Sequence, residues 1–416
     1  MIPAGGSPSS ARTARIAVST LFFVKGATIA SVVPRLPEIK ESLGLSNAEL
    51  GAAVAALPVG GLVAGAVAGV LIHRVGSGRL SVVTGVLGAL SLALLGLAWS
   101  WATLAAAYFV FGMLDATMDA AMNAHGLGVQ RRYRRSIIHG FHGWWSAGNM
   151  AAGAVGVAAA AIAMPVAVDL GLVGGGLAIA TLVASRGLLP DREADALAED
   201  AIDGQEVRLR TLPRLLRILG PVALIGILST VIQDAASTWS PIYLVGTLGL
   251  GAGVGASAFV LYTGSMTLGR LTNDRWVNRW GDVTVVRVAG LAAAAGLAAV
   301  GMAAPLGAPV LAFAGFAVVG LGAAPMFPAM FAVAGSVPGI PTGHGVAIVS
   351  WLARVGAVLA PAVFGIVADA RGVAVAFFVP LAAALVIAAV AQVSLRPPTG
   401  DRSAAAPPTP RRSGAS

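Results

Sequence analysis

Long apolar runs separated by short polar breaks fill most of this chain. Twelve of these runs approach the roughly 20 residues that a helix needs to cross a bilayer. A longer polar stretch separates the first six runs from the last six. The pattern predicts an all-α polytopic membrane protein with twelve transmembrane helices, over 16–37, 48–71, 81–99, 102–125, 137–162, 165–185, 218–243, 253–273, 285–303, 308–333, 343–368 and 372–394.

The same pattern divides the chain into two bundles, one linker and two tails. The tails are rich in Pro, Ser, Ala and Gly and are expected to be disordered. Residues 208–217, at the end of the linker, interleave Arg with Leu, which fits either a basic amphipathic helix on the membrane surface or a solvated linker. The predicted segments are a cytoplasmic tail (1–13), an N-terminal six-helix bundle (14–185), a cytoplasmic linker (186–217), a C-terminal six-helix bundle (218–394) and a second cytoplasmic tail (395–416).

Composition excludes a soluble fold and several kinds of catalysis. Hydrophobic residues make up 57% of the chain and charged residues 11%, whereas about 25% of residues in soluble domains are charged. The chain has no Cys, which excludes disulfides, thiol catalysis and Cys-bound metals. The five His residues show no metal-ligand spacing, and no phosphate-binding P-loop motif occurs. We therefore expect neither an enzyme, nor a metal or other cofactor, nor an ATP-driven pump.

The formal net charge of +9 is explained by the orientation of the chain in the membrane. Of the 27 Lys and Arg residues, 22 fall on the side of the termini and three fall on the other side. The positive-inside rule then places both termini in the cytoplasm, as in a bacterial inner-membrane protein. Because topology accounts for the cations, no nucleic-acid partner is expected. Membrane lipid is the expected surrounding, and the chain is expected to be a monomer.

Comparison of the sequence with itself reveals a duplication at an offset of 205 residues. Leu43-Gly44-Leu45 aligns with Leu248-Gly249-Leu250, and residues 73–76 align with 278–281. One ungapped offset serves loops and spans across half of the chain. The sequence therefore predicts two related six-helix units.

Three stretches and one loop carry a family resemblance. The stretches are Pro34–Leu45, Asp119–Asn123 and Ser136–Ser146, and the loop runs from Gly69 to Arg79. In these segments the chain resembles the major facilitator superfamily, and more narrowly its MosC-like branch, which is distantly similar to fucose permease. The resemblance implies two pseudo-symmetric bundles that rock about a substrate site near the membrane midplane.

The resemblance also implies a gating loop between the second and third spans. His73 stands where the family motif normally has Asp, whereas the copy in the second half keeps Asp274. This departure weakens the ion pair that the family uses there. The gating-loop residues are Gly69, His73, Arg74, Gly76, Arg79, Asp274 and Arg275.

Five ionisable residues lie deep inside the predicted spans: Lys25, Asp115, Asp119, Asp234 and Arg354. Charges at this depth cost several kcal/mol unless they are paired or hydrated. Together the five sum to one negative charge, which a single proton would neutralise. Asp119 is therefore the predicted proton-coupling carboxylate, with Asp115 and Lys25 as its partners. Alternatively, Asp115 or Asp119 is a permanent structural partner of Lys25.

Polar and aromatic residues in the spans are candidates for the substrate wall. Arg354 suits a carboxylate or phosphate, but Asp234 would neutralise it if the two were paired. For each Trp, helix packing is an alternative to contact with the substrate. The predicted substrate-binding residues are Asn123, Trp144, Trp145, Asn149, Gln233, Asp234, Trp239, Tyr262 and Arg354.

These observations predict a secondary active transporter that moves a small polar solute by alternating access and is coupled to protons. The solute is a sugar, a polyol, an organic acid or a hydrophobic metabolite, and the direction of transport is open. Three alternatives remain: an uncoupled facilitator, a drug or metabolite exporter, and a non-transporting membrane sensor or assembly partner.

Overall fold

The computed structural model describes residues 8–133, 137–199, 212–337 and 342–395. Within these ranges the chain is helical and contains no strand. The first half holds α1 (Pro8–Val32), the 3-10 turn η1 (Val33–Arg35), α2 (Leu36–Ser42), α3 (Asn47–Val75), α4 (Ser77–Gly96), α5 (Trp101–Tyr133), α6 (Ile138–Ala161), α7 (Val166–Ser185) and α8 (Asp191–Glu199). The second half holds α9 (Leu212–Ile242), the π-helical turn η3 (Tyr243–Thr247), α10 (Ala252–Ala303), α11 (Pro309–Ala323), α12 (Met326–Gly335), α13 (Thr342–Arg371), α14 (Val373–Ala376) and α15 (Phe378–Ser394).

The described helices account for twelve membrane spans. Ten candidates are long and apolar enough to cross a bilayer. One of them, α10, crosses twice, because its backbone leaves the helical conformation at Gly281. The twelfth span is α6, whose 24 residues are not among these ten candidates and pack between α1 and α10. The predicted all-α architecture is confirmed.

Several helix ends differ from the predicted spans, because helices continue beyond the apolar membrane core. α1 begins at Pro8 rather than at residue 16, and α5 continues to Tyr133. The first part of the linker forms the helix α8. Of the Arg- and Leu-rich segment 208–217, residues 208–211 lie outside the described residues and α9 begins at Leu212.

The backbone repeats the duplication seen in the sequence. Gly44 and Gly249, which are 205 residues apart, both follow a helix end with φ of +61° and +68°. Gly76 and Gly281, also 205 residues apart, have φ of +95° and +77°. Side-chain-bearing residues rarely adopt these left-handed conformations. The same two sharp turns therefore recur in each half, and the halves are pseudo-symmetric copies.

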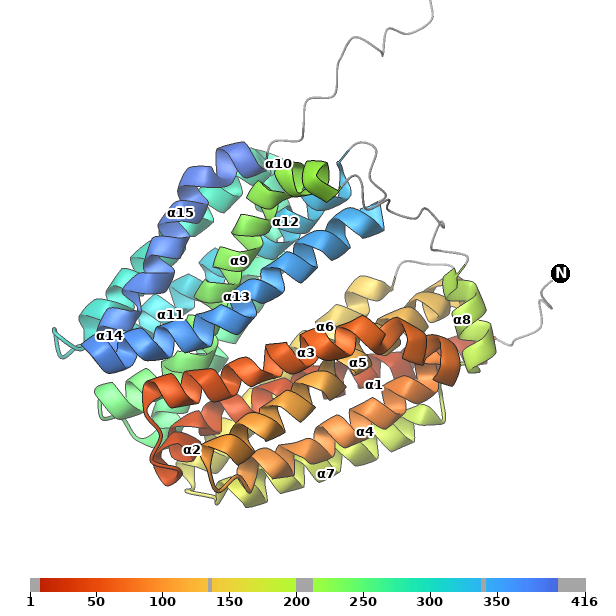
Figure 1. The fold of residues 1–416 in the computed structure, drawn as a ribbon, viewed down its shortest axis with the longest axis horizontal. Helices are drawn as coiled ribbons and strands as arrows, with labels where there is room; N and C mark the ends of the chain where they lie inside the picture. The colour runs from red at the N-terminus through yellow and green to blue at the C-terminus, as the bar shows by residue number, and fades with distance from the viewer. Residues whose placement is uncertain (1–7, 134–136, 200–211, 338–341, 396–416) are drawn as a thin grey trace, which may run out of the picture.

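The two halves form two bundles that meet at one end, as Figure 1 shows. We call this end the α2 end, and the opposite one the α8 end. At the α2 end, Asp369 at the end of α13 accepts hydrogen bonds from the start of α3: Asn47 N at 2.9 Å, Asn47 Nδ2 at 2.8 Å and Ala48 N at 2.8 Å. Gly51 and Gly365 let the same two helices approach backbone to backbone. Toward the α8 end the bundles diverge (Figure 1).

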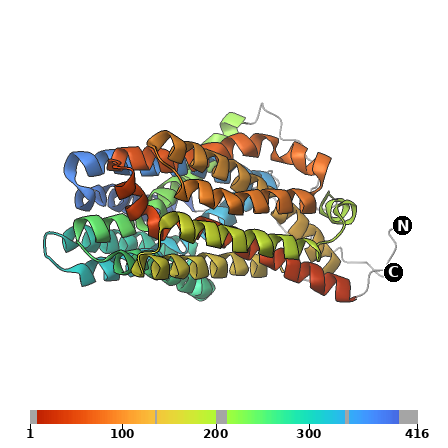
Figure 2. The same ribbon diagram turned by 90° about the horizontal axis from the view of Figure 1, so that it is seen from below.

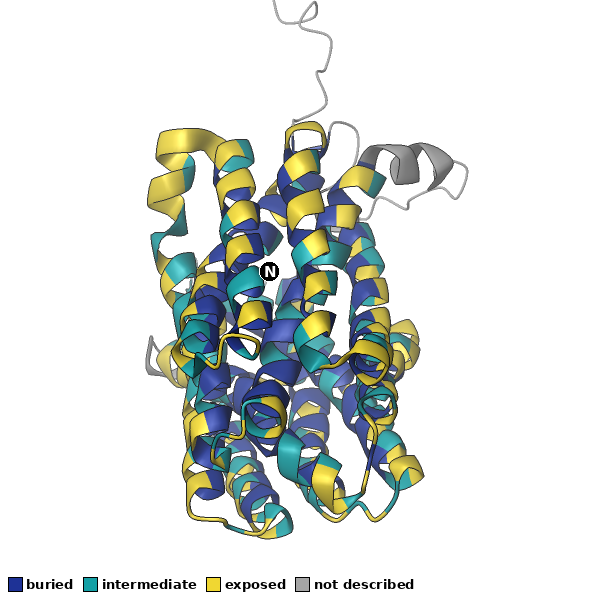
Figure 3. Cartoon of the chain, turned by 90° about the vertical axis from the view of Figure 1, so that its left-hand side faces the viewer, coloured by how far each residue is buried: buried dark blue, intermediate teal, exposed yellow. Residues whose placement is uncertain are grey.

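Apolar side chains cover the outside of both bundles along their length. Figure 2 shows the spans running side by side, and Figure 3 shows that their buried faces turn toward neighbouring helices. On α4, for example, exposed side chains recur at helical spacing at Val83, Leu87, Leu90 and Leu94. An apolar outer surface of this extent suits lipid rather than water.

Candidate functional site

A charged cluster joins α1 to α5 near the middle of both helices. The ammonium of Lys25 lies 3.0 Å from Asp115 Oδ1, 3.2 Å from Asp115 Oδ2 and 3.4 Å from Asp119 Oδ1. The Lys25 side chain is 8% exposed, whereas Asp115 is 17% and Asp119 44% exposed. One buried cation therefore holds two carboxylates, of which the second is open to solvent.

The sequence places these side chains by helical spacing and by close packing. Asp115 and Asp119 are four residues apart, so they share one face of α5. Gly26, next to Lys25, lies against the backbone of Trp145, and a methyl group at Gly26 would come within 2.0 Å of that carbonyl oxygen. The close contact between α1 and α6 fixes the position from which Lys25 reaches α5.

Asp119 is the more exposed carboxylate of the cluster. Asp119 lies near the middle of the 33-residue α5, a helix long and apolar enough to cross a bilayer. A carboxylate at that depth is tolerated when it faces water or a cation, not acyl chains. Its contact with Lys25 of α1 directs it to the inner side of the bundle. Asn123, one turn further, donates to the Asp119 carbonyl at 2.8 Å.

Arg354 brings a second cation to this centre from the other bundle. It lies on α13, and its Nη1 would be 3.5 Å from a methyl group at Gly61 of α3. Within the described residues, Arg354 forms no ion pair within 4 Å, with Asp234 or with any other carboxylate.

Asp234 lies apart from these residues, in the second bundle on α9. Its Oδ1 accepts a hydrogen bond from Thr238 Oγ1 at 2.9 Å, and its Oδ2 is buried without a partner in the described structure. The indole of Trp239 and the phenol of Tyr262 lie beside it. Gln233 Nε2 and Trp239 Nε1 are also buried without a hydrogen-bond partner of ordinary geometry.

The remaining substrate-wall candidates differ in exposure. Trp144 is 52% exposed and meets Phe23 edge to face, whereas Trp145 packs partly buried against the core between α1 and α5. Asn149 is buried on α6, and its Oδ1 has no partner in the described part of the chain. Trp239 is fully buried and stacks on Phe364 of α13.

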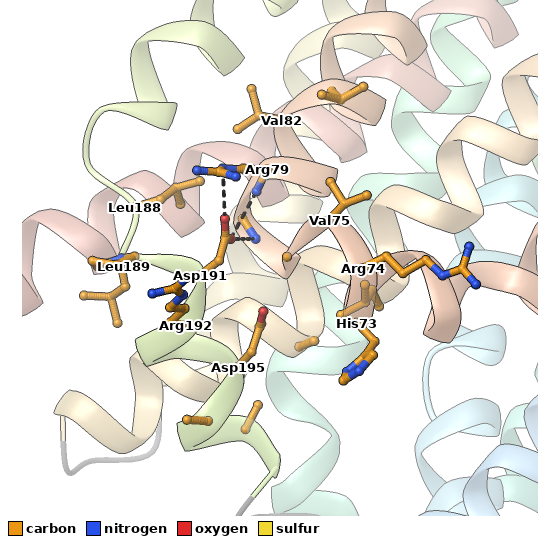
Figure 4. A pocket seen from close by; sticks show the side chains of 18 of the residues that line it. His73, Arg74, Val75, Arg79, Val82, Leu188, Leu189, Asp191, Arg192 and Asp195 are labelled. Atoms are coloured by element: carbon orange, nitrogen blue, oxygen red, sulfur yellow. Dashed lines mark hydrogen bonds and ion pairs between the residues drawn. The ribbon is translucent and has the colours of Figure 1, made fainter. Parts of the chain in front are cut away.

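The predicted gating loop lies at the α8 end, where α8 packs against it. Figure 4 shows Asp191 of α8 directed toward the start of α4 and toward Arg79. Asp191 Oδ1 accepts from the backbone of Gly78 at 2.7 Å, and its Oδ2 lies 3.4 Å from Arg79 Nε. Asp195 accepts from the backbone of Ser77 at 3.3 Å. The first turn of α4 is thus capped by carboxylates from the linker, in a loop where the family's own Asp is absent.

The other loop residues are open to solvent. His73 and Arg74 are exposed beside a cavity of about 1360 Å³ between α3, α4 and α8. Gly76 turns the chain with positive φ next to Asp191. In the second half, Asp274 and Arg275 are exposed, and neither has an ion pair in the described part of the chain.

Sequence reasoning missed three carboxylates that organise the ends of the spans. Asp369 and Asp191 each cap a helix that is distant in sequence. Asp169 lies 3.0 Å from the fully buried Arg35, which also pairs with Glu38 at 2.5 Å and donates to the Met164 carbonyl. Each residue lies near a helix end, where a charge is unremarkable, and only the fold reveals its partner.

Comparison with known proteins agrees with this architecture. The family model described as "Major Facilitator Superfamily" matches residues 18–343. An MFS-type transporter of Yersinia pestis is 29% identical over 385 residues, covering 92% of this chain and 96% of its own length. The membrane protein MosC of Rhizobium meliloti is 27% identical, over 89% of this chain and 88% of its own. The crystal structure of the nucleoside transporter NupG superposes with a TM-score of 0.73 at 15% identity, over 91% of this chain and 98% of that one.

Proposed function

The chain belongs to the Major Facilitator Superfamily, and on that premise we propose that it moves a small polar solute across the bacterial inner membrane, coupled to protons. That it is a membrane transporter of this type follows from the family and from its named relatives. The observation that carries the proposal is the Lys25–Asp115–Asp119 cluster, in which a half-exposed carboxylate lies at the depth of the membrane midplane.

The proposed orientation puts the α8 end in the cytoplasm. Arg74, Arg79, Arg131 and Arg132 lie at that end, and the positive-inside rule supports this assignment. The protein then opens to the cytoplasm and is closed at the periplasmic α2 end. Because the chain has no native Cys, single cysteines test the assignment cleanly. In intact spheroplasts, an impermeant maleimide should label Ser42→Cys at the α2 end and should not label Arg79→Cys at the α8 end.

The proposed coupling step is a change of partners around Lys25. With Asp119 ionised, Lys25 is shared between two carboxylates. When Asp119 takes a proton from water, Lys25 pairs with Asp115 alone, and the link between the two carboxylates is weakened. A proton thereby changes the electrostatics between α1 and α5, which is the kind of local event that can bias a two-state fold.

The proposed substrate lies between the bundles, next to this cluster. Arg354 supports a solute with an anionic or strongly accepting group, because its guanidinium has no ion-pair partner within the described residues. Asn149 and Gln233 offer unpaired polar atoms. Sugars, polyols, organic acids and hydrophobic metabolites are the classes to screen.

Reconstituted vesicles test the proposal. Purified protein is placed in proteoliposomes with an inward proton gradient, and radiolabelled members of each class are offered. At least one solute should accumulate, and a protonophore should abolish its accumulation. Uptake that stops at equal concentrations on both sides, and that the protonophore does not change, would favour an uncoupled facilitator instead. If no member of the four classes enters, the proposed substrate range is wrong.

A further inference from the structure

Two equivalent helices at the junction between the bundles each carry a polar side chain. α13 packs against α3 of the first bundle, and α6 packs against α10 of the second. Arg354 of α13 and Asn149 of α6 are 205 residues apart, which is the offset that relates the two halves. The duplication therefore puts a guanidinium and an amide at matching positions of the two contacts between bundles.

The guanidinium of Arg354 reaches the first bundle at a gap left by a glycine. A methyl group at Gly61 of α3 would lie 3.5 Å from Arg354 Nη1 and 3.4 Å from the Cβ of Ala116 on α5. The neighbouring Gly60 has a different role, because it lets α3 approach the backbone of α5 at Phe109. Gly61 thus leaves room beside the guanidinium, between α13 and the two helices of the first bundle.

The fork of Arg354 is not used by any carboxylate of the described residues. Lys25, the other cation in the middle of the spans, lies 3.0 Å from Asp115 and 3.4 Å from Asp119. Arg354 is partly exposed, and an arginine in a membrane span requires water or an anion around its charge. Its planar N–H groups match the paired oxygens of a carboxylate or a phosphate.

The charge of the site distinguishes between these two anions. Arg354 supplies one positive charge, and Lys25 already shares its charge between two carboxylates. A carboxylate brings one negative charge, which Arg354 balances. A phosphate monoester brings about −1.5 to −2 charges at pH 7, and the excess would stay uncompensated where desolvation makes it costly. The balance of charge therefore favours a carboxylate.

We propose that the solute is a small monocarboxylate, whose two oxygens accept hydrogen bonds from the Arg354 guanidinium in the space beside Gly61. Arg354 holds the acid group, and Gly61 sets how closely the rest of the solute approaches α3. This inference rests on the proposed function and narrows its four solute classes to organic acids. It concerns binding and does not require that transport be coupled to protons.

Calorimetric titration of the purified full chain tests the inference without any gradient. Lactate, gluconate and benzoate are each titrated beside the matching neutral carboxamide. At least one acid should bind about thirtyfold or more tightly than its carboxamide, because the amide lacks the charge that pairs with the guanidinium. If no acid binds, or if every acid binds no better than its carboxamide, the inference is wrong.

Two substitutions of Arg354 assign this preference to its side chain. Arg354→Gln removes the charge, so the acid should lose its advantage over the carboxamide. Arg354→Lys keeps the charge without the planar fork and should keep a part of that advantage. Because both ligands are titrated into the same preparation, a partial loss of folded protein does not change the ratio. An undiminished preference for the acid in Arg354→Gln would overturn the inference.

A second pair of variants keeps the test decisive if Arg354→Gln does not fold. Gly61→Val fills the space beside the guanidinium and should weaken binding of the acid about tenfold or more, as overpacking does elsewhere. Gly65→Val, one turn further along α3, is the matched control, because an added Cβ there meets no atom within 4 Å. Equal affinities in the two variants would contradict the inference.

The outcomes for this inference and for the proposed function can be told apart. A neutral solute that accumulates with protons would support the proposed function and refute the monocarboxylate. Acid binding that depends on Arg354, together with uptake that a protonophore does not change, would refute the proposed coupling and support the monocarboxylate.

Discussion

The two bundles share a backbone plan and treat buried carboxylates differently. In the first bundle, Asp115 and Asp119 share Lys25, and the Asp119 side chain is 44% exposed. In the second bundle, Asp234 has a hydroxyl donor, two aromatic neighbours and no cation in the described structure. The duplicated turns at Gly76 and Gly281 show that the scaffold was copied. The buried charged residues, in contrast, differ between the two halves.

This difference gives the buried carboxylates of the two bundles different electrostatic surroundings. Asp115 and Asp119 share a cation from a neighbouring helix, whereas Asp234 is stabilised by a hydroxyl of its own helix. On the proposed coupling step, proton exchange therefore belongs to the first bundle.

The largest expected effect follows removal of Lys25. Lys25→Met would leave the largely buried Asp115 next to Asp119 without their cation, which should destabilise the protein by about 3–5 kcal/mol. Unfolding in detergent, followed by tryptophan fluorescence in denaturant, measures the loss. The double variant Lys25→Met with Asp115→Asn removes one carboxylate as well and should recover a large part of the stability. Equal losses in the single and double variants would show that Lys25 does not serve Asp115.

The next effect concerns Asp119 and separates coupling from binding. A one-unit pH gradient can drive roughly tenfold accumulation of a solute that moves with one proton. Asp119→Asn should lose this accumulation, because its amide does not titrate. Exchange of labelled for unlabelled solute should continue, since exchange needs no net proton movement. Thr117→Val serves as a control on α5, because the Thr117 hydroxyl bonds to the Met113 carbonyl of the same helix. Normal accumulation in Asp119→Asn would remove Asp119 from the coupling step.

A smaller effect is expected at the seal between α13 and α3 at the α2 end. Asp369 accepts three hydrogen bonds from the start of α3, and charged acceptors of this kind contribute about 1.5–3 kcal/mol. Asp369→Asn should open the α2 end by roughly tenfold, as measured by spin labels at Ser42 and Val375. Arg371→Gln, at an exposed neighbour, should not change the distances. A seal unaffected by Asp369→Asn would place its stability elsewhere.

The smallest effect is expected at the cap supplied by α8. Asp191→Asn weakens the charge at the start of α4, and a helix cap of this kind is worth about 1 kcal/mol. The backbone amides of Gly78 and Arg79 should then exchange hydrogen roughly fivefold faster, since about 1 kcal/mol of local stability is lost. Arg192→Gln, an exposed neighbour on α8, is the matched control. Unchanged exchange in Asp191→Asn would mean that the cap does not hold this turn.

The sequence predicted the spans and the duplication because both are local or periodic properties. Apolar runs of membrane length and a fixed offset of 205 residues need no tertiary information. Pairings across the fold were harder to predict. That Asp115 and Asp119 share one helix face follows from their spacing. That Lys25 contacts both depends on how α1 packs against α5, which the local sequence does not show.

Two features of the candidate site depended wholly on the fold. A neutralising contact between Arg354 and Asp234 was open in the sequence, and the structure instead brings Arg354 against Gly61 of α3. The caps from Asp369 and Asp191 join segments that are more than a hundred residues apart. Residue type alone does not distinguish such a cap from a solvated surface charge.

Substrate-induced proton movement tests the central claim most directly. Proteoliposomes holding a trapped pH-sensitive dye are given the solute found by screening, with no gradient imposed at the start. The account predicts that adding solute outside acidifies the interior in the unmutated protein and does not do so in Asp119→Asn. Solute entry at an unchanged internal pH in the unmutated protein would contradict it.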